Sequence, residues 1–553
     1  MSGEPNYDSW TKTSLIQRLR ELESQVKKQQ EAPAPPSEDV SKDDAAAAPG
    51  HGARKAKAKR KMDPSRHASR FVALKLAYLG KNYGGFEFQA TGNQPSIEEE
   101  LWKALTKACL IFPEDERTVQ FDCCEYSKCG RTDRGVSAFG QVIGLRVRSN
   151  RPLPRTENAE GQEGGEEEEL EQEAHEEGNG RAADEPPFDD LRDELCYPRI
   201  LNRLLPGDIR ILAWCPSPPA DFSARFSCRE RQYRYFFTQP AFAPTPSSQE
   251  TNGLETGWLD VAAMRDAAKR FEGDQDFRNF CKIDPGKQIT NFRRHIFEAD
   301  IVQVASDADP DDDLLACRLP KPGFAPANLP GGSGPFPKTY YFHVRGSAFL
   351  WHQIRHMVAV LFLVGQRLEP PSIVTELLDT ARNPGRPSYN MADEVPLVLW
   401  DCLFPDLTKG ESDERTDALD WIYVGEEHAP NKFGQFGVME SLWKLWRGHK
   451  MDELLSSQLL QLVSQQGTPA QLAQKEASVA TTSTGSGNSS ARIFEGGNAG
   501  RLGGRYVRIM DRERLQTPDE QNERYAQRKG FASVAAMRAA REEQQQAKSI
   551  DNS

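Results

Sequence analysis

The chain has 553 residues, of which 27% are charged, 37% are hydrophobic and 37 are prolines. No apolar run approaches the roughly 18 residues that a membrane-spanning helix needs, and the N-terminus lacks a signal-peptide pattern, so no membrane partner is expected. The ten cysteines include no Cys-x-x-Cys pair. Their spacing predicts neither a disulfide framework nor a metal site, and it favours a soluble protein in a reducing intracellular compartment.

Negative charge is concentrated in one segment. The formal net charge is −12, yet residues 157–194 hold 17 acidic side chains against Arg181 and Arg192, a net of −15. The rest of the chain therefore carries +3. A block of like charges repels itself and is typical of disordered segments. The folded part is mildly basic, which leaves binding to a polyanion open.

Four stretches are too poor in apolar residues to build a core. They are 31–61, 151–194, 304–337 and 467–500. The composition predicts a short amphipathic or coiled-coil helix in 1–30, a disordered basic linker in 31–69, a folded region in 70–465 with disordered acidic insertions at 151–194 and 304–337, a disordered linker in 467–500, and a tail in 501–553 that docks partly on the core.

The first half of the folded region reads as a strand, a helix and a second strand. Residues 71–78 predict a strand, and a loop rich in Gly and aromatics follows. Ser96 and Glu99 have the spacing of a capping box, and the apolar stripe after them predicts a helix. Residues 143–147 alternate apolar and polar side chains, as in a strand with one solvated face. This order indicates an α+β domain rather than a doubly wound one.

The second half repeats the mixture. Strands are predicted at 233–237 and 340–344, helices at 261–271 and 351–366, and two further helices at 437–446 and 451–465. The last helix carries the apolar residues Leu454, Leu455, Leu459 and Leu462. Such a face most often packs on the protein's own core, and it could also join two copies of the chain.

The segment 128–138 is the most informative part of the sequence. Its Thr-Asp-x-Gly stretch is, taken alone, typical of a turn in which Gly supplies a positive φ. However, Asp133 lies between Arg131 and Arg134. Neighbouring cations keep a carboxylate ionised by lowering its pKa. An ionised carboxylate suits a nucleophile, and the arginines suit a phosphate backbone.

Four blocks in the range 71–405 resemble, in order, the signature of the TruA family of tRNA pseudouridine synthases. They are Gly-Arg-Thr-Asp-x-Gly-Val at 130–136 with Gly-Gln-Val at 140–142, Asn202 with Leu-Pro-Gly-Asp-Ile at 205–209, Phe-Ser-Ala-Arg-Phe at 222–226 leading into 231–235, and Gly-Ser-Ala-Phe-Leu at 346–350 with Gln-Ile-Arg at 353–355. Ser137 and the segments 276–284 and 396–402 resemble the eukaryotic branch, whose members act on uridines 38 and 39 of the tRNA anticodon stem-loop.

The resemblance implies a pseudouridine synthase fold, in which two related subdomains share a mixed, mostly antiparallel sheet around a central active-site cleft. It also implies a homodimer. The reaction breaks the C1′–N1 bond, rotates the uracil and rejoins it through C5. This isomerisation is redox-neutral and transfers no group to a carrier, so no cofactor is expected.

The resemblance also assigns roles to residues. Asp133 is implied to be the nucleophile, Tyr233 to pack on the flipped base, and Arg355 to pair with the Asp133 carboxylate. Arg131, Arg134 and Arg225 are expected to line a basic cleft for the substrate.

Each of these roles has a plainer alternative. A tyrosine in a strand is more often part of a core, and an arginine in an apolar helix needs a partner in any case. His352 and His356 have the i, i+4 spacing of a metal pair, but without a third ligand they are interpreted as structural or RNA-facing.

Two other functions remain open at this point. A catalytically silent RNA-binding protein on the same scaffold would lack the carboxylate, and Asp133 is present. A synthase of a neighbouring branch would act on other RNA positions. The basic run Arg54–Lys61 fits a nuclear address, an RNA-contacting arm or a solubilising tail, so a location in the nucleus and cytoplasm is expected.

Overall fold

The computed structural model describes residues 62–153, 188–243, 254, 257–304, 337–405, 417–464, 466, 492–494, 496, 501–502 and 506–551. The predictions for 1–61, and for most of the two insertions and of the linker before the tail, lie outside these residues. Within the described part of the chain, no helix combines the length and the apolar character needed to span a bilayer.

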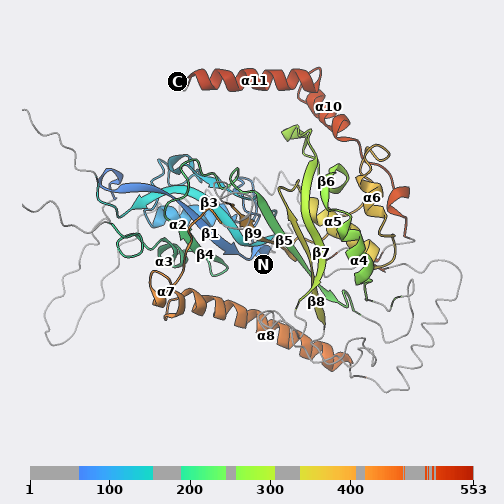
Figure 1. Cartoon of the computed structure of the whole chain (residues 1–553), viewed down its shortest axis with the longest axis horizontal. Helices are drawn as coiled ribbons and strands as arrows, with labels where there is room; N and C mark the ends of the chain where they lie inside the picture. The colour runs from blue at the N-terminus through green and yellow to red at the C-terminus, as the bar shows by residue number, and fades with distance from the viewer. Residues whose placement is uncertain are drawn as a thin grey trace, which may run out of the picture. The chain divides into compact units, whose positions relative to one another are not determined.

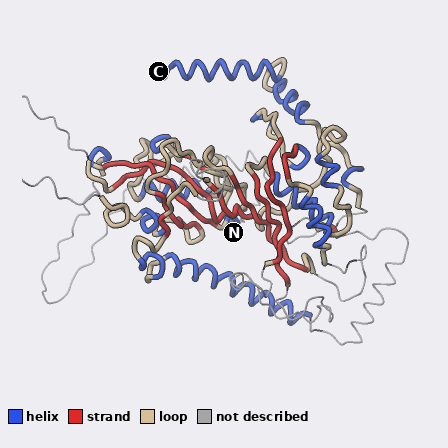
Figure 2. Tube along the Cα trace, in the orientation of Figure 1, coloured by secondary structure: helices blue, strands red, loops and turns tan. Residues whose placement is uncertain are grey.

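Ten strands form one sheet (Figure 1; Figure 2). They are β1 (Ala68–Tyr78), β2 (Ser127–Lys128), β3 (Ser137–Ser149), β4 (Ile209–Cys215), β5 (Glu230–Gln239), β6 (Gly273–Asp276), β7 (Arg293–Gln303), β8 (Lys338–Gly346), β9 (Leu397–Leu403) and β10 (Ile422–Tyr423). Their order is β10-β4-β1-β3-β9-β5-β8-β7-β6, and β2 pairs with β3. Only the short β3–β9 pairing is parallel among these pairs. The predicted α+β class with a mixed, mostly antiparallel sheet is confirmed.

The helices divide the interior into two buried clusters. They are α2 (Ile97–Lys107), α3 (Tyr197–Asn202), α4 (Val261–Lys269), α5 (Gln353–Gly365), α6 (Ile373–Leu378), α7 (Ala429–Phe433), α8 (Val438–Ser464), α10 (Pro518–Arg528) and α11 (Val534–Asp551). In Figure 1, α2 and α3 lie with β1, β3 and β4, and side chains of these elements form the first cluster. Helices α4, α5 and α6 form the second cluster with β5, β7 and β8. The strand β5 lies between the two halves, and its Tyr233 packs against both clusters.

Two helices show how composition and burial combine. Every residue of α5, from Gln353 to Gly365, is buried, as expected for a helix that is apolar on all sides after its first turn. The two helices predicted at 437–446 and 451–465 are wrong as separate elements, because α8 is one helix of 27 residues. Gly448 lies between them, and a glycine costs a helix only about 1 kcal/mol, which is too little to end it when no proline follows.

The prediction of disorder for 151–194 is wrong at its C-terminal end, because residues 188–194 pack on the sheet. The side chain of Glu194 is 0% exposed, and its Oε2 lies 3.0 Å from Nη1 of Arg70 on β1. Asp190 pairs with the same guanidinium. Arg70 is buried, and a buried charge needs a partner of opposite sign. Two acidic side chains of the insertion thus neutralise a buried charge of the sheet.

This difference predicts two outcomes. Replacing residues 155–186 by a short Gly/Ser linker is expected to leave the midpoint of chemical unfolding unchanged, because their composition cannot build packing. Glu194→Gln is expected to destabilise the protein by about 2 kcal/mol, since Arg70 loses a charged hydrogen-bond partner. The control is Glu125→Gln, whose exposed pairing with Arg146 contributes at most about 1 kcal/mol. A linker variant as unstable as Glu194→Gln would contradict the first outcome.

The predicted linker 467–500 is wrong near residue 494. In a short ribbon, β11 (Arg492–Ile493) pairs with β12 (Arg501–Leu502). Phe494 is buried, its N–H donates to Gln366 Oε1 at 2.9 Å, and Gln366 Nε2 donates back to its carbonyl at 2.8 Å. The hydroxyl of Tyr235 donates to the carbonyl of Gly496. An apolar Ile-Phe pair explains this docking, because both side chains join the second buried cluster.

The tail predicted at 501–553 contacts the core through Glu369 and Arg386. Glu369 Oε1 accepts hydrogen bonds from the Tyr506 hydroxyl and the Ile509 N–H, each at 2.6 Å. The Leu515 N–H donates to the carbonyl of Arg386 at 2.8 Å. These contacts hold the segment before α10 against the half of the sheet that carries α5 and α6.

Candidate active site

A cleft of about 980 Å³ opens where the two buried clusters meet. All six residues predicted for the site line it, namely Arg131, Asp133, Arg134, Arg225, Tyr233 and Arg355. Nine Lys or Arg side chains and four Asp or Glu side chains line the cleft. Low-dielectric walls of one net sign focus the electrostatic field, so the cleft attracts a polyanion. The structure thus brings the six residues together in one cleft in which basic side chains outnumber acidic ones.

Buried polar side chains of the sheet hold the loop that carries Asp133. Gln141 on β3 is 0% exposed. Its Oε1 accepts from the Gly130 N–H at 3.0 Å, and its Nε2 donates to the Gly130 carbonyl at 2.8 Å. The hydroxyls of Thr132 and Tyr78 share a hydrogen bond of 2.7 Å. Because the side chains of Tyr78, Thr132 and Gln141 are buried and all these groups are paired, the loop has little freedom to move.

The turn that the Thr-Asp-x-Gly pattern predicts is also present. The Val136 N–H donates to the carbonyl of Asp133 at 3.2 Å, and Gly135 has a φ of +79°. A Cβ on Gly135 would lie 2.5 Å from Cγ of Glu394. The turn thus needs glycine for both its conformation and its space. The predicted turn therefore forms part of the candidate site, and the two interpretations of this segment are compatible.

Asp133 points into the cleft with its carboxylate held on both oxygens. Its side chain is 25% exposed. Oδ1 accepts a hydrogen bond from Nε1 of Trp351 at 3.1 Å, and Oδ2 lies 3.5 Å from Nε2 of His352. The carboxylate is therefore oriented by two rings and still reachable by a ligand in the cleft.

The pKa of Asp133 is raised rather than lowered, contrary to the expectation drawn from its neighbours Arg131 and Arg134. Burial raises this pKa above its ordinary value, the charge of Arg355 and the Trp351 hydrogen bond oppose the rise, and the charge of Glu394 adds to it. Arg131 and Arg134 flank Asp133 in sequence but are exposed, where solvent screens their charges. Desolvation therefore dominates.

Arg355 does not form the predicted ion pair with Asp133. Its Nη2 lies 2.6 Å from Oε2 of Glu394, and its Nε donates to the carbonyl of Ala392 at 2.8 Å. Arg355 is 6% exposed, so it requires a partner, and the segment before β9 supplies one. Its charge nevertheless lowers the pKa of Asp133. Arg355 thus acts on the carboxylate through space.

His352 lies beside Asp133 in a conformation that few residues adopt. It precedes α5 with a φ of +62°, in the left-handed region. Burial first, and then the charges of Arg355, Lys282 and Arg386, lower its pKa to about 4, so the imidazole is neutral at neutral pH. Its Nδ1 has no hydrogen-bond partner in the described part of the chain. His352 lines the cleft, but this nitrogen is buried.

His356 does not share this position. It is buried and packs edge-to-face against the ring of Tyr389 at 5.3 Å. Neither His352 nor His356 belongs to a metal-ligand group within the described residues. Their i, i+4 spacing therefore reflects one residue in the cleft and one in the core.

The other predicted site residues lie around the rim and wall of the cleft. Tyr233 is half-buried and meets Phe349 edge-to-face at 5.2 Å. Burial raises its pKa well above the ordinary value, so the phenol is neutral. Nη1 of Arg131 lies 3.4 Å from Oε2 of Glu87 in a solvent-exposed ion pair. Arg131 and Arg225 are both exposed, so an anionic ligand can reach either guanidinium.

The lining residues that were not predicted include Trp351, Lys282 and Glu394. Trp351 is 39% exposed, Lys282 Nζ lies 4.5 Å from its ring centroid, and Glu394 holds Arg355. Trp351 begins the apolar segment that contains Arg355, and Lys282 lies in the 276–284 block. Both positions were therefore close to recognised patterns. Nothing in the sequence indicated the pairing through Glu394.

Known proteins are similar in sequence to most of this chain. The chain is 38% identical over 451 residues to the tRNA pseudouridine(38/39) synthase of Mus musculus, which covers 81% of this chain and 74% of the mouse protein. It is 38% identical over 403 residues to the protein of that name from Saccharomyces cerevisiae, covering 72% of each. A tRNA pseudouridine synthase A of Methanothrix thermoacetophila is 26% identical over 68% of this chain and 98% of its own length. A family model described as tRNA pseudouridine synthase matches residues 267–405. The chain therefore belongs to the TruA family of tRNA pseudouridine synthases.

Proposed function

We propose that this protein isomerises uridine to pseudouridine at positions 38 and 39 of the tRNA anticodon stem-loop, with Asp133 as the nucleophile. The observation that carries the proposal is a partly exposed carboxylate, held by Trp351 and His352, at the wall of a basic cleft. The curated relatives from mouse and yeast are named for these two positions.

The chemistry needs few groups. The C1′–N1 bond breaks, the uracil turns, and a C1′–C5 bond forms, while C5 loses a proton and N1 gains one. A carboxylate nucleophile can form a covalent intermediate with the substrate, which persists while the C1′–N1 bond is replaced by the C1′–C5 bond. The cleft is at the upper end of the roughly 300–1,000 Å³ typical of ligand sites, which accommodates an extruded nucleotide. Tyr233 offers an aromatic face for the flipped base, and the rim arginines offer donors for phosphates.

The target positions follow from RNA physics as well as from the names of the relatives. Enzymes that act on a base extrude it from the helix, and extrusion costs least where a stem meets a loop. Positions 38 and 39 lie at such a junction. The anticodon stem-loop is therefore the proposed partner.

Site-resolved pseudouridine mapping of total tRNA, with and without this protein, tests the function. Loss at positions 38 and 39 only is the expected result, and reintroduction of the wild-type chain restores both. Loss confined to positions outside the anticodon arm would move the protein to another branch of the family. No loss at any position would favour a silent RNA-binding protein.

The pKa of Asp133 makes the pH dependence predictable. A nucleophilic carboxylate must be ionised, so activity falls as the pH drops through its pKa. Trp351→Phe removes a hydrogen bond that lowers this pKa, so the acidic limb of kcat is expected to move to higher pH. Glu394→Gln removes a negative charge that raises it, so the limb should move to lower pH. Single-turnover rates at saturating tRNA measure both.

The matched control for these variants is Trp102→Phe, which also loses an indole hydrogen bond, to the carbonyl of Gln120, but lies outside the cleft. The acidic limb of the pH–activity profile of this control should stay at the pH of the wild-type protein. Shifts of the two test variants in the same direction would contradict the assignment of the limb to Asp133.

We further propose that two copies of the chain associate through α8. Large apolar side chains on this helix are exposed, including Trp443 at 60%, Leu455 at 68% and Leu459 at 63%. Several large exposed apolar side chains on one helix favour an interaction site, and the family resemblance implies a homodimer. Light scattering should give the mass of two chains, and a Leu455→Glu, Leu459→Glu variant should give one. A wild-type monomer at micromolar concentration ends this proposal.

For location, we propose the nucleus together with the cytoplasm, on the basis of the run Arg54–Lys61 and a tRNA substrate. Microscopy of a tagged chain with these basic residues changed to alanine should show a reduced nuclear fraction. An unchanged distribution would show that this segment is not a nuclear localisation signal.

A further inference from the structure

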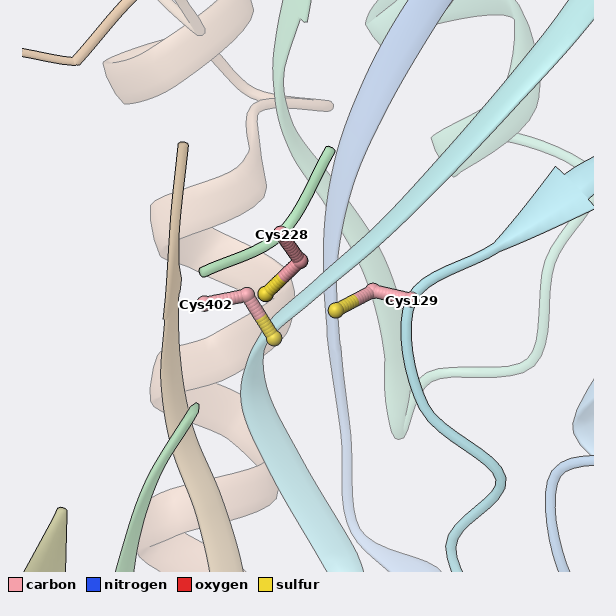
Figure 3. A group of neighbouring side chains, drawn as sticks. All are labelled: Cys129, Cys228 and Cys402. Carbon is pink, nitrogen blue, oxygen red and sulfur yellow. The ribbon is translucent and has the colours of Figure 1, made fainter. Parts of the chain in front are cut away.

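Three cysteines that are far apart in sequence meet at one point beside the Asp133 loop. The Sγ atoms of Cys129, Cys228 and Cys402 lie within 4.8 Å of one another, and all three residues are buried. Figure 3 shows the three sulfurs converging from separate segments. Buried free cysteines often act as small apolar side chains. That packing role does not by itself explain why three sulfur atoms lie together.

The position of this cysteine cluster is at the base of the active site. Cys129 lies four residues before Asp133 and lines the cleft. Cys228 lies between Arg225 and β5, and Cys402 lies on β9, where it pairs in register with Arg231 of β5. A link among the three sulfurs would therefore join the catalytic loop to the two strands at the centre of the sheet.

The charge beside the cysteine cluster is positive and has no acidic partner. The guanidinium of Arg231 donates only to backbone carbonyls within the described residues, those of Ser347 at 2.8 Å, Arg225 at 3.0 Å and Cys129 at 3.3 Å. The ionisable side chains that interact with its charge are the three cysteines and Tyr233. Arg231 is partly buried, and a cation drawn out of solvent is stabilised by nearby negative charge. Thiolates bound to a metal ion would supply that charge.

We propose that Cys129, Cys228 and Cys402 bind one thiophilic metal ion, of the Zn²⁺ or Cu⁺ class, which ties the Asp133 loop to β5 and β9. Thiolates are the ligands that these ions prefer. Metal–sulfur bonds of about 2.3 Å place three sulfurs about 4 Å apart around one ion. The observed separations thus need only a small inward movement. Three thiolates and Zn²⁺ carry −1, which Arg231 balances. Cu⁺ accepts three ligands without a fourth.

Metal content of the full-length protein tests this inference without reference to catalysis. The chain is purified under reducing conditions, stripped by a chelator, and titrated without oxygen with Zn²⁺ in one arm and Cu⁺ in the other. One ion per chain in either arm is expected, together with a higher thermal unfolding temperature, because an ion that binds only the folded state stabilises it. Absence of stoichiometric binding in both arms overturns the proposal.

Variants and spectroscopy assign the bound ion to the cysteine cluster. Cys228→Ala and Cys402→Ala should lose the ion, whereas Cys215→Ala, which alters an equally buried thiol on β4, should retain it. Should a cluster variant fail to fold, X-ray absorption of the loaded wild-type protein decides, with three sulfur neighbours at about 2.3 Å expected. Fewer than three sulfurs, or an ion retained by a folded Cys228→Ala variant, overturns the proposal. Because neither readout measures pseudouridine, failure here leaves the proposed function untouched.

Discussion

The Asp133→Asn variant is expected to form pseudouridine at least about 10³-fold more slowly than the wild-type protein, because loss of a nucleophile removes a whole catalytic route. Asparagine keeps the shape of the side chain and can still accept from Nε1 of Trp351, so the loop should keep its position. Single-turnover formation of pseudouridine in tRNA, read by mass-shift mapping, measures the loss.

Binding and stability separate this effect from misfolding. The affinity of the Asp133→Asn variant for tRNA should be close to that of the wild-type chain, because the cleft keeps its excess of basic side chains. Its stability at neutral pH should be equal or higher. The folded-state pKa of Asp133 is raised by burial, so ionisation of Asp133 costs stability as pH rises through the window between its unfolded and folded pKa values. Activity near wild type would remove Asp133 from the reaction.

Arg355→Met is expected to cost about 3 kcal/mol of stability, the scale for breaking a buried ion pair. The change leaves Glu394, whose side chain is 31% exposed, without its cation, and the carbonyl of Ala392 without its donor. It also removes the charge that lowers the pKa of Asp133. Chemical unfolding should show a lower midpoint, and the acidic limb of activity should move to higher pH.

A double variant separates the two effects of Arg355. Arg355→Met combined with Glu394→Gln removes both charges, so much of the lost stability should return. The rescue distinguishes a broken pair from a cavity, because a cavity would persist in the double variant. Loss of activity without any change in the unfolding midpoint would instead mean that Arg355 contacts the substrate and has little structural role.

Local pattern determined much of this protein. The strand at 71–78 and the helix at 351–366 follow from hydrophobic periodicity, which depends only on neighbours along the chain. The placement of Asp133 in a tight turn follows from its own loop sequence. The six residues that the resemblance singled out all line one cleft, because the blocks that hold them come together at the centre of the sheet.

Tertiary structure decided the properties that depend on distant partners and on burial. Arg355 pairs with Glu394 rather than Asp133, because the segment before β9 folds back against α5. The pKa of Asp133 rises because the cleft desolvates it, and desolvation is set by the surrounding walls rather than by the flanking arginines. Glu194 is buried against Arg70 although its composition predicted solvent. Cys129, Cys228 and Cys402 converge because three separate segments end at one point of the sheet, and no spacing along the chain encodes that point.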